Sequence, residues 1–407
     1  MTAELGDNAE SSTGASMRVC VVVGTRPEAI KLAPVILRLQ ATAGVACTIV
    51  NTGQHREMCI QALDAFGIRA DLDLEAMSPG QSLGQLTARL CSAFEELFEG
   101  RSFDWLIVQG DTTSAMAAAL VAFYRGLRIA HVEAGLRTYN RFSPFPEEIN
   151  RTIIGHIGDR HFPPTAAAEQ NLLRAGVDRA SILVTGNTVI DALHILKPAI
   201  AERSLGGVFP AGATVESTGA TLLLVTSHRR ESLGAGIANI CRALTDLVDR
   251  YPDLVVAFPV HLNPKARESV MRILSGHPRI HLLEPLPYLD LMVLLARCRL
   301  ILTDSGGIQE EAPSFGKPVL ILRDVTERPE VVDVGAARLV GTDRDEIVRN
   351  ACELLENRAI YDRMANAGNP FGDGRAAERI VDSLLMDRSR AAASHRPGGG
   401  LRRGTAL

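Results

Sequence analysis

The stretch MRVCVVVGTRPEAIK, residues 17–31, decides how the chain folds. It opens with a short apolar run rich in β-branched residues, which predicts a fully buried strand. Gly24 ends that run and permits a tight turn, and Pro27 suits the first turn of a helix over residues 27–40. A buried strand, a glycine turn and a helix in this order are typical of a βαβ unit in a parallel sheet.

The same alternation continues along the 407 residues, a length typical of two domains. A linker rich in Gly, Ala, Pro and Ser is expected at residues 197–219. Strands are expected before it at 46–53, 104–111 and 128–135, and after it at 221–228, 253–261, 279–285, 299–307 and 317–324. The predicted fold class is therefore α/β, with two halves, helices on both faces of each parallel sheet and a cleft between the halves.

The composition excludes several classes of protein. With 43 basic and 47 acidic side chains the net charge is -4, which gives no electrostatic reason to expect nucleic acid or a membrane surface as partner. No apolar run reaches the roughly 18 residues of a spanning helix, and residues 1–16 lack the apolar core of a secretory signal. The seven cysteines form no CxxC pair. We therefore expect a cytoplasmic protein with reduced thiols and no bound metal.

Three carboxylates follow successive strands of the first half. Asp111 lies in QGDTTS, Glu133 in HVEAGLRT and Glu147 in SPFPEEINR. Each alone is ordinary, because Asp111 can cap the next helix and Glu147 matches a helix start. The carboxyl ends of parallel strands meet at one edge of a sheet, so we expect the three side chains to converge there. Closely placed carboxylates push one another's pKa values apart, which general acid–base chemistry requires.

A second group of motifs suits an anion. Arg26 and Lys31 in GTRPEAIK lie near exposed helix amides, although an ordinary turn with solvated charges explains them as well. In TDSGGIQEEA a buried strand ends, Gly306 and Gly307 let the backbone approach a ligand, and a helix begins. That arrangement holds a diphosphate, unless the glycines only start a helix.

The same helix places Glu311 one turn further on, where its carboxylate can accept hydrogen bonds from ribose hydroxyls, and RDVTERPE supplies Arg328 nearby. His228 in TSHRRES and His261 in PVHLNP follow other strands of the second half. After the strand at 46–53, TGQHREM brings Gln54, His55 and Arg56 together, either as a ligand site or as a solvated loop. The glycine turn at residue 24 is not a GxGxxG fingerprint, so no NAD and no other cofactor is expected.

These segments, together with TGNTVIDAL, resemble the non-hydrolysing UDP-N-acetylglucosamine 2-epimerases. The matching motifs run in family order from about residue 18 to residue 375. The resemblance implies two Rossmann-like domains in the GT-B arrangement, with UDP bound in the cleft between them. It implies the following division: a disordered extension at 1–16, an N-terminal domain at 17–190 that carries the acids, a UDP-binding domain at 191–371, a helix at 372–387 that returns to the first domain, and a disordered basic tail at 388–407.

The resemblance also implies roles for individual residues and an activity. The family's catalytic acids fall on Asp111, Glu133 and Glu147, and its functional histidine falls on His228. Its substrate contacts fall on Arg26, Lys31, His261, Ser305, Gly306, Gly307, Glu311 and Arg328, and an activating second site on Gln54, His55 and Arg56. The implied enzyme is a homodimer that interconverts UDP-GlcNAc and UDP-ManNAc for cell-surface polysaccharide biosynthesis.

Simple chemistry narrows the route of such a reaction. The C2 hydrogen of an N-acetylhexosamine is not acidic, and without NAD the sugar is not oxidised at C3 to acidify it. Breaking the C1–O bond to UDP places positive charge at C1 and makes that hydrogen acidic. We therefore expect elimination to 2-acetamidoglucal and re-addition of UDP, with the two proton transfers on opposite faces of C2. The alternatives are an epimerase of a related UDP-amino sugar, a GT-B glycosyltransferase, a hydrolysing relative and a non-enzymatic nucleotide-sugar sensor.

Overall fold

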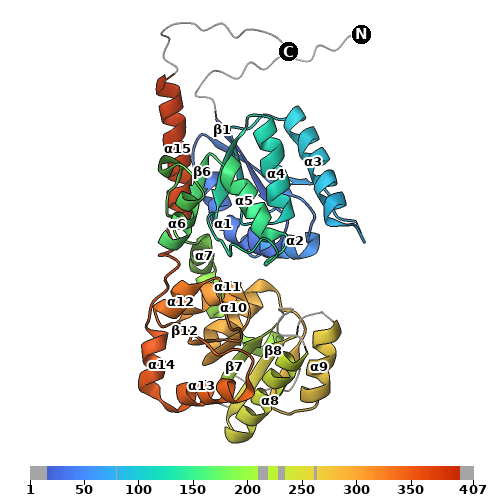
Figure 1. The fold of residues 1–407 in the computed structure, drawn as a ribbon, viewed down its shortest axis with the longest axis vertical. Coiled ribbons are helices and arrows are strands. Elements are labelled where there is room, and N and C mark those ends of the chain that lie inside the picture. Colours follow the sequence, from blue (N-terminus) through green and yellow to red (C-terminus); the bar gives the residue numbers. More distant parts are fainter. Residues whose placement is uncertain (1–15, 79, 210–218, 228–233, 261–263, 395–407) are drawn as a thin grey trace.

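The computed structural model describes residues 16–78, 80–209, 219–227, 234–260 and 264–394 (Figure 1). Within this part the chain forms two sheets of six parallel strands, with the orders β3-β2-β1-β4-β5-β6 and β12-β11-β10-β7-β8-β9. Counted within its own half, each sheet has the strand order 3-2-1-4-5-6 of a Rossmann fold. The prediction of two Rossmann-like domains is confirmed.

The first sheet consists of β1 (Met17–Val23), β2 (Val45–Asn51), β3 (Leu72–Asp73), β4 (Trp105–Gln109), β5 (Arg128–Val132) and β6 (Arg160–Phe162). The second consists of β7 (Thr221–Thr226), β8 (Leu254–Pro259), β9 (Ile280–Leu283), β10 (Leu300–Thr303), β11 (Val319–Ile321) and β12 (Ala337–Leu339). The sequence did not predict β3, β6 and β12. These strands have two or three residues each, which is too short for an apolar pattern to show.

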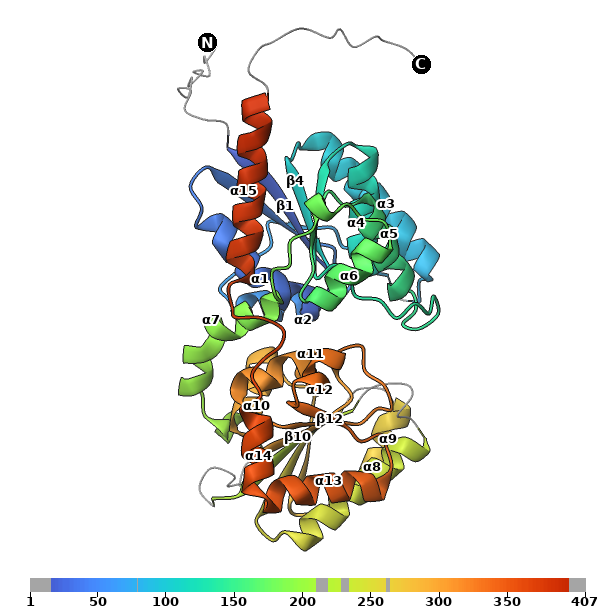
Figure 2. The same ribbon diagram turned by 60° about the vertical axis from the view of Figure 1, so that its left-hand side comes forward.

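Helices cover both sheets (Figures 1 and 2). Those of the first domain are α1 (Arg26–Gln40), α2 (Arg56–Asp64), α3 (Leu83–Gly100), α4 (Thr113–Tyr124), α5 (Glu147–Ile157) and α6 (Ala166–Arg174). Those of the second are α8 (Ala235–Arg250), α9 (Pro264–Leu274), α10 (Tyr288–Arg297), α11 (Gly306–Glu311), α12 (Pro329–Asp333), α13 (Arg344–Glu356) and α14 (Arg358–Ala365). Among the described helices, none is both long and apolar enough to cross a membrane.

Strand β1 shows why the opening apolar run reads as continuous. Val19, Val21 and Val23 belong to one buried cluster, whereas Cys20 and Val22 belong to another on the opposite face of the sheet. Because helices cover both faces, every position of the strand is buried except Arg18. The alternation of polar and apolar residues that marks a half-exposed strand is therefore absent.

Helix α7 (Thr188–Glu202) connects the two halves and packs against α1 on one side and against α10 and α11 on the other. A boundary between residues 190 and 191 cuts through this helix. The expected linker at 197–219 also overlaps its last turn and a half, because α7 continues through Pro198. The prediction of a linker from residue 197 was wrong, since burial of Leu196 and Ile200 keeps the segment helical.

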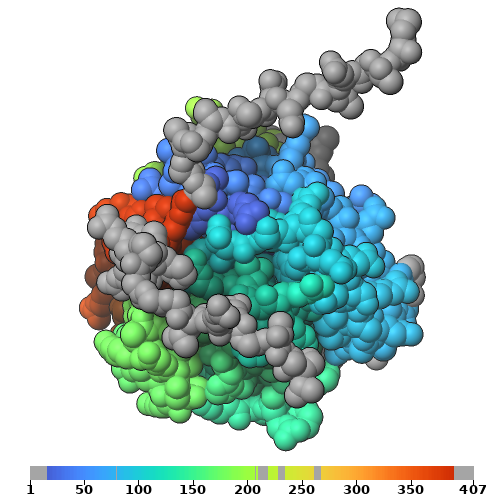
Figure 3. All heavy atoms as spheres, turned by 90° about the horizontal axis from the view of Figure 1, so that it is seen from above, coloured from blue at the N-terminus to red at the C-terminus, as the bar shows by residue number. Residues whose placement is uncertain are grey.

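Helix α15 (Ala376–Ser394) returns from the second domain and lies along the first, against α1 and α7 (Figures 1 and 3). It begins after residue 372 and ends beyond residue 387, so the prediction of disorder from residue 388 was wrong for the segment up to Ser394. The segment RSRAAAS contains good helix formers, and its basic composition concealed that propensity. Residues 1–15 and 395–407 lie outside the described part.

Candidate active site

A cavity of about 510 Å³ lies between the two domains, at the carboxyl ends of both sets of strands. Its lining follows β1, β4 and β5 of the first sheet and β7, β8, β9 and β10 of the second. The strand pairs β1–β4 and β7–β10 are the points where the strand order reverses in each sheet. Such switch points are where open α/β sheets bind ligands.

The cavity brings together most of the predicted site residues. Its lining includes Arg26, Lys31, Asp111, Glu133, Glu147, Ser305, Gly306, Gly307, Glu311 and Arg328. His228 and His261 lie outside the described residues. Gln54, His55 and Arg56 are not part of the lining.

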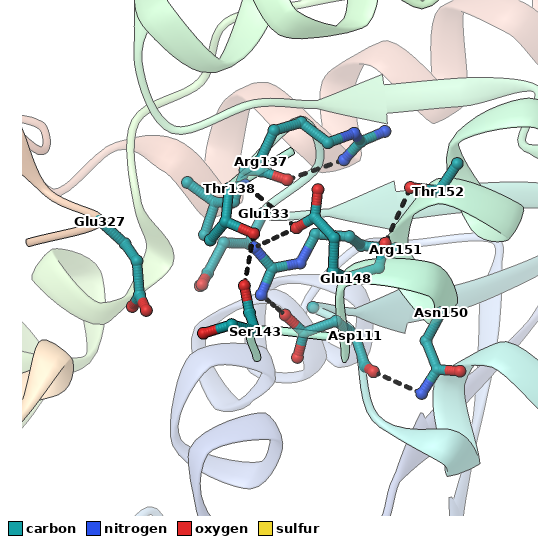
Figure 4. Close-up of polar contacts among 12 residues, drawn as sticks. Asp111, Glu133, Arg137, Thr138, Ser143, Glu148, Asn150, Arg151, Thr152 and Glu327 are labelled. Atoms are coloured by element: carbon teal, nitrogen blue, oxygen red, sulfur yellow. Dashed lines mark hydrogen bonds and ion pairs between the residues drawn. The ribbon is translucent and has the colours of Figure 1, made fainter. Parts of the chain in front are cut away.

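Asp111 points its carboxylate at the cavity and does not cap α4. The cap is Thr112, whose side chain accepts a hydrogen bond from the backbone N–H of Ala115 at 3.0 Å. The Asp111 carboxylate instead contacts the Nη2 atom of Arg151, and its backbone carbonyl accepts from Asn150 Nδ2 at 2.9 Å (Figure 4). Helix α5 of the same domain therefore fixes the orientation of Asp111.

The two glutamates at the start of α5 have different surroundings. The carboxylate of Glu148 is buried and accepts hydrogen bonds from the backbone N–H groups of Thr138 at 3.1 Å and Tyr139 at 3.0 Å (Figure 4). Glu147 is half-buried and lines the cavity. Glu148 thus holds the preceding loop in place, and Glu147 is the acid that faces the ligand space.

Glu133 has a backbone conformation that sequence patterns do not reveal. Its φ is 60°, in the left-handed region that non-glycine residues rarely adopt. Its carboxylate accepts a hydrogen bond from Gln109 Nε2 at 3.0 Å and pairs with Lys31. Burial raises the pKa of Glu133, although the Lys31 ammonium opposes that shift. Strained, buried and charge-paired residues of this kind cluster at active sites.

The second domain contributes a tight turn before α11. A Cβ atom added to Gly306 would lie 2.6 Å from Nη1 of Arg328, so any larger residue there would have to displace that guanidinium. A Cβ on Gly307 would meet no neighbour closer than 3.9 Å, at Ser305 Oγ. The guanidinium of Arg328 therefore lies directly against the turn that the sequence predicted for a diphosphate.

Glu311 lies at the end of α11, where its carboxylate accepts a hydrogen bond from the Tyr288 hydroxyl at 2.9 Å. Burial raises the pKa of Glu311 to about 7. Glu311 and Tyr288 both line the cavity.

Sequence reasoning missed Glu28, which joins the two turns of the first domain. Its carboxylate accepts hydrogen bonds from the N–H groups of Gly24 at 3.0 Å and Thr25 at 2.7 Å, and from Thr112 Oγ1 at 2.5 Å. Burial raises the pKa of Glu28 to about 7. The spacing Thr-x-x-Glu at residues 25–28 is a capping-box signature and is the signal that points to it. Arg151 and Glu310 were missed as well.

The loop at Gln54, His55 and Arg56 lies next to the β1–α1 turn. The Gln54 side-chain carbonyl accepts from Ser114 Oγ at 2.7 Å, and the His55 N–H donates to the carbonyl of Gly24 at 2.8 Å. Arg56 is half-exposed and its Nε lies 2.8 Å from an oxygen of Asp73. The loop is thus connected to the cavity wall through Gly24 without reaching the cavity itself.

No group of three or more His, Cys, Asp or Glu side chains placed to hold a metal ion occurs in the described part of the chain. Within the cavity, Lys31 pairs with Glu133 and Arg151 pairs with Asp111. Two Rossmann-like domains whose strand ends meet at a shared cavity define an α/β protein of the GT-B class. Carboxylates on one wall and a glycine turn with an arginine on the other make this an enzyme-type site for an anionic ligand.

Comparisons with known proteins identify the family. The sequence model of the family described as UDP-N-acetylglucosamine 2-epimerase matches residues 37–385. The chain is 46% identical over 373 residues to the UDP-N-acetylglucosamine 2-epimerase of Escherichia coli (strain K12), covering 91% of this chain and 99% of that one. It is 45% identical over 371 residues to the enzyme of Bacillus subtilis (strain 168), covering 91% and 95%.

Solved structures agree with that result. The UDP-GlcNAc 2-epimerase of Neisseria meningitidis, bound to UDP-GlcNAc, matches with a TM-score of 0.85 at 44% identity, covering 91% of this chain and 100% of that one. The Methanocaldococcus jannaschii UDP-GlcNAc 2-epimerase in complex with UDP-GlcNAc and UDP matches with a TM-score of 0.77 at 33% identity, with the same coverage. The chain belongs to the UDP-N-acetylglucosamine 2-epimerase family and is an epimerase, which confirms the resemblance and the predicted fold class.

Proposed function

We propose that the enzyme interconverts UDP-GlcNAc and UDP-ManNAc at C2 by eliminating UDP to 2-acetamidoglucal and adding it back. The observation that carries the proposal is the pairing of two unlike walls in one cavity. Asp111, Glu133 and Glu147 lie on the first-domain wall, and Gly306 and Arg328 lie on the second. The first wall suits proton transfer at the sugar, and the second suits the charge of a departing diphosphate.

The bond changes balance without a cofactor. In the first step the C1–O bond to UDP breaks, its electron pair leaves with the diphosphate, and a base takes the proton from C2 to leave a C1=C2 double bond. In the second step a proton adds to the opposite face of C2 and the diphosphate oxygen bonds to C1 again. Groups that bind the diphosphate more strongly as its negative charge grows accelerate both steps.

The surroundings of the acids support a division of labour. Asp111 contacts the Arg151 guanidinium, which orients the carboxylate that we propose as the base that removes the C2 proton. Glu133 has a raised pKa and lies against Lys31, which suits an acid that returns a proton. Glu147 then stabilises positive charge near C1, as carboxylates do in glycosidases. For His228 we propose that it positions or protonates the leaving diphosphate.

The remaining proposed substrate contacts are Arg26, Lys31, Ser305, Gly307, Glu311 and His261. Arg26 also crosses the cavity, with its Nη1 atom 3.4 Å from the carbonyl oxygen of Leu286 in the second domain. The ligand would therefore bind between two domains that the contact of Arg26 with Leu286 already connects. Binding of the nucleotide by one wall and the sugar by the other would place C1 and C2 against the first-domain acids.

Incubation of the enzyme with UDP-GlcNAc in D2O tests the proposal. Deuterium at C2 of both nucleotide sugars, with scrambling of isotopic oxygen from the glycosidic bridge, is the expected result. Retention of the C2 hydrogen and of the bridging oxygen would contradict it. Free ManNAc would indicate a hydrolysing enzyme, turnover only with an acceptor sugar would indicate a glycosyltransferase, and turnover of a modified UDP-amino sugar alone would indicate a different substrate.

We further propose that UDP-GlcNAc binds at a second, activating site that involves Gln54, His55 and Arg56, and that the enzyme is a homodimer. The hydrogen bond from the His55 N–H to Gly24 supports the first idea, because it connects that loop to the turn before Arg26. A sigmoidal dependence of rate on UDP-GlcNAc is expected, and Arg56→Ala should make it hyperbolic. Analytical ultracentrifugation tests the dimer.

A further inference from the structure

A buried ionic cluster joins the two domains at the floor of the cavity. The Lys31 ammonium contacts the Glu133 carboxylate in its own domain and lies 2.9 Å from Oε2 of Glu310 in the second domain. The other oxygen of Glu310 lies 2.5 Å from Nε of Arg328. Glu310 is thus shared between a cation of each domain, and Lys31 is shared between a carboxylate of each domain.

The charged groups of this cluster are buried, which strengthens the electrostatic interactions between them. The side chains of Lys31, Glu133 and Glu310 are exposed by only 9%, 8% and 2%. Charges this deep are poorly screened by water or salt, so each one alters the proton affinity of its neighbours. Two carboxylates that share one ammonium are not equivalent when only one of them also makes an ion pair with Arg328.

Glu310 is the better stabilised of the two carboxylates. Although burial alone would raise it, the pKa of Glu310 lies below its ordinary value because Arg328 and Lys31 stabilise its charge. Burial raises the pKa of Glu133 and the charge of Glu310 raises it further, whereas Lys31 and Arg328 oppose that shift. A proton that enters this cluster therefore goes to Glu133.

We propose that Glu310 is a positioning residue of the second domain that shares Lys31 with Glu133 and thereby increases the proton affinity of Glu133, the acid proposed to return a proton to C2. The proposal deepens the proposed function, and it rests on that function only for the transfer of the proton from Glu133 to C2. The groups that face Glu133 are Lys31 from α1, Gln109 from β4, Glu310 from α11 and Arg328, which precedes α12. Since Glu310 comes from the other domain, its contribution to the proton affinity of Glu133 requires both domains to be in place.

The Glu310→Gln substitution tests this by removing the charge and keeping the size. Without the negative charge of Glu310, the Lys31 ammonium stabilises the charge of Glu133 alone. The pH at which Glu133 loses its proton therefore falls by about 1 unit or more. The measurement is an infrared titration of the carboxyl C=O band in the full-length enzyme without ligand. The band of Glu133 is assigned by its loss in Glu133→Gln.

Glu330→Gln is the matched control. Glu330 Oε1 accepts a hydrogen bond from Thr165 Oγ1 at 2.8 Å, which also joins the two domains but does not touch the cluster. The midpoint of the Glu133 titration in Glu330→Gln should equal that of the wild type. An unchanged midpoint in Glu310→Gln, or an equal fall in Glu330→Gln, would overturn the proposal.

Two further measurements keep the test decisive. If Glu310→Gln does not fold, Glu310→Asp withdraws the carboxylate from Lys31 by one methylene, and a smaller fall of the midpoint is expected; no fall overturns the proposal. In kinetics, the limb of the pH–rate profile that reports Glu133 should move to lower pH in Glu310→Gln, and an unmoved limb counts against the role. A wild type that shows no epimerisation would contradict the proposed function, while the titration would still decide the role of Glu310.

Discussion

The two halves of the molecule share one strand order and present opposite chemistry at the same place. After β4 and β5 the first sheet presents Asp111 and Glu133, and after β10 the second presents Ser305, Gly306 and Gly307. The topology therefore determines where a ligand binds, and the loop sequences determine what each wall can do. We expect substitutions of the acids on the first wall to reduce turnover and substitutions in the glycine turn of the second wall to reduce nucleotide affinity.

The largest effect is expected for the acids of the first wall. Asp111→Asn, Glu133→Gln and Glu147→Gln should each lower kcat by about 10²–10⁴-fold, because each removes proton transfer or charge stabilisation in the transition state. Affinity for UDP, measured by calorimetry, should change little. Glu330→Gln serves as the control acid outside the cavity. Near-normal turnover in all three variants would show that the acids were misassigned.

The glycine turn of the second wall should show the opposite behaviour. Gly306→Ala places a Cβ atom 2.6 Å from the Arg328 guanidinium, which Glu310 and Glu327 hold in place. Overpacking of about 1–3 kcal/mol should weaken UDP binding by roughly 10–100-fold. The Cβ atom of Gly307→Ala would make only ordinary van der Waals contacts, so this variant should lose less affinity for UDP. Equal losses in the two variants would mean that the close approach of Arg328 does not explain the glycine.

A smaller effect is expected from the ionisation of Glu311, whose pKa burial raises to about 7. Ribose hydroxyls donate hydrogen bonds best to the charged carboxylate, so affinity should rise as pH increases through 7 and fall below it. Between pH 8 and pH 6 the loss should be up to about tenfold. UDP-GlcNAc binding to the Asp111→Asn variant measures it, since that ligand has no phosphate that titrates in this range.

Adding Glu311→Gln should make that binding independent of pH. Glu28 has a similarly raised pKa and also lines the cavity, so Glu28→Gln is the comparison variant. If Glu28→Gln rather than Glu311→Gln removes the dependence, the titrating group belongs to the first wall.

The smallest effect concerns α15, the segment that follows the second domain and packs on the first. The Asp191 carboxylate in α7 accepts hydrogen bonds from the N–H groups of Ala376 at 3.2 Å and Ala377 at 2.8 Å. Asp191→Ala should lower the free energy of unfolding by about 0.5–2 kcal/mol, as loss of a helix cap does. The exposed ion pair between Asp382 and Arg38 is the control, and Asp382→Ala should cost less.

Local sequence was sufficient to predict most of the strands and several residues of the candidate site. The run MRVCVVVG predicted a buried strand because burial on both faces requires apolar residues at nearly every position. Asp111, Glu133 and Gly306 were found because each directly follows such a run, and strands that lie parallel place their ends together. The strands of two or three residues were missed because so short a segment carries no period.

Sequence alone determined the two α/β halves, the edge at which each binds and the residue types that each edge offers, because strand, turn and helix signals are local. Only the tertiary structure decided which charges meet. Lys31 contacts Glu133 across 102 positions of sequence and then Glu310 in the other domain, and Arg328 lies against Gly306. Such contacts depend on how turns and helices pack within each domain and between the two domains, and a charge takes its proton affinity from the neighbours that this packing gives it.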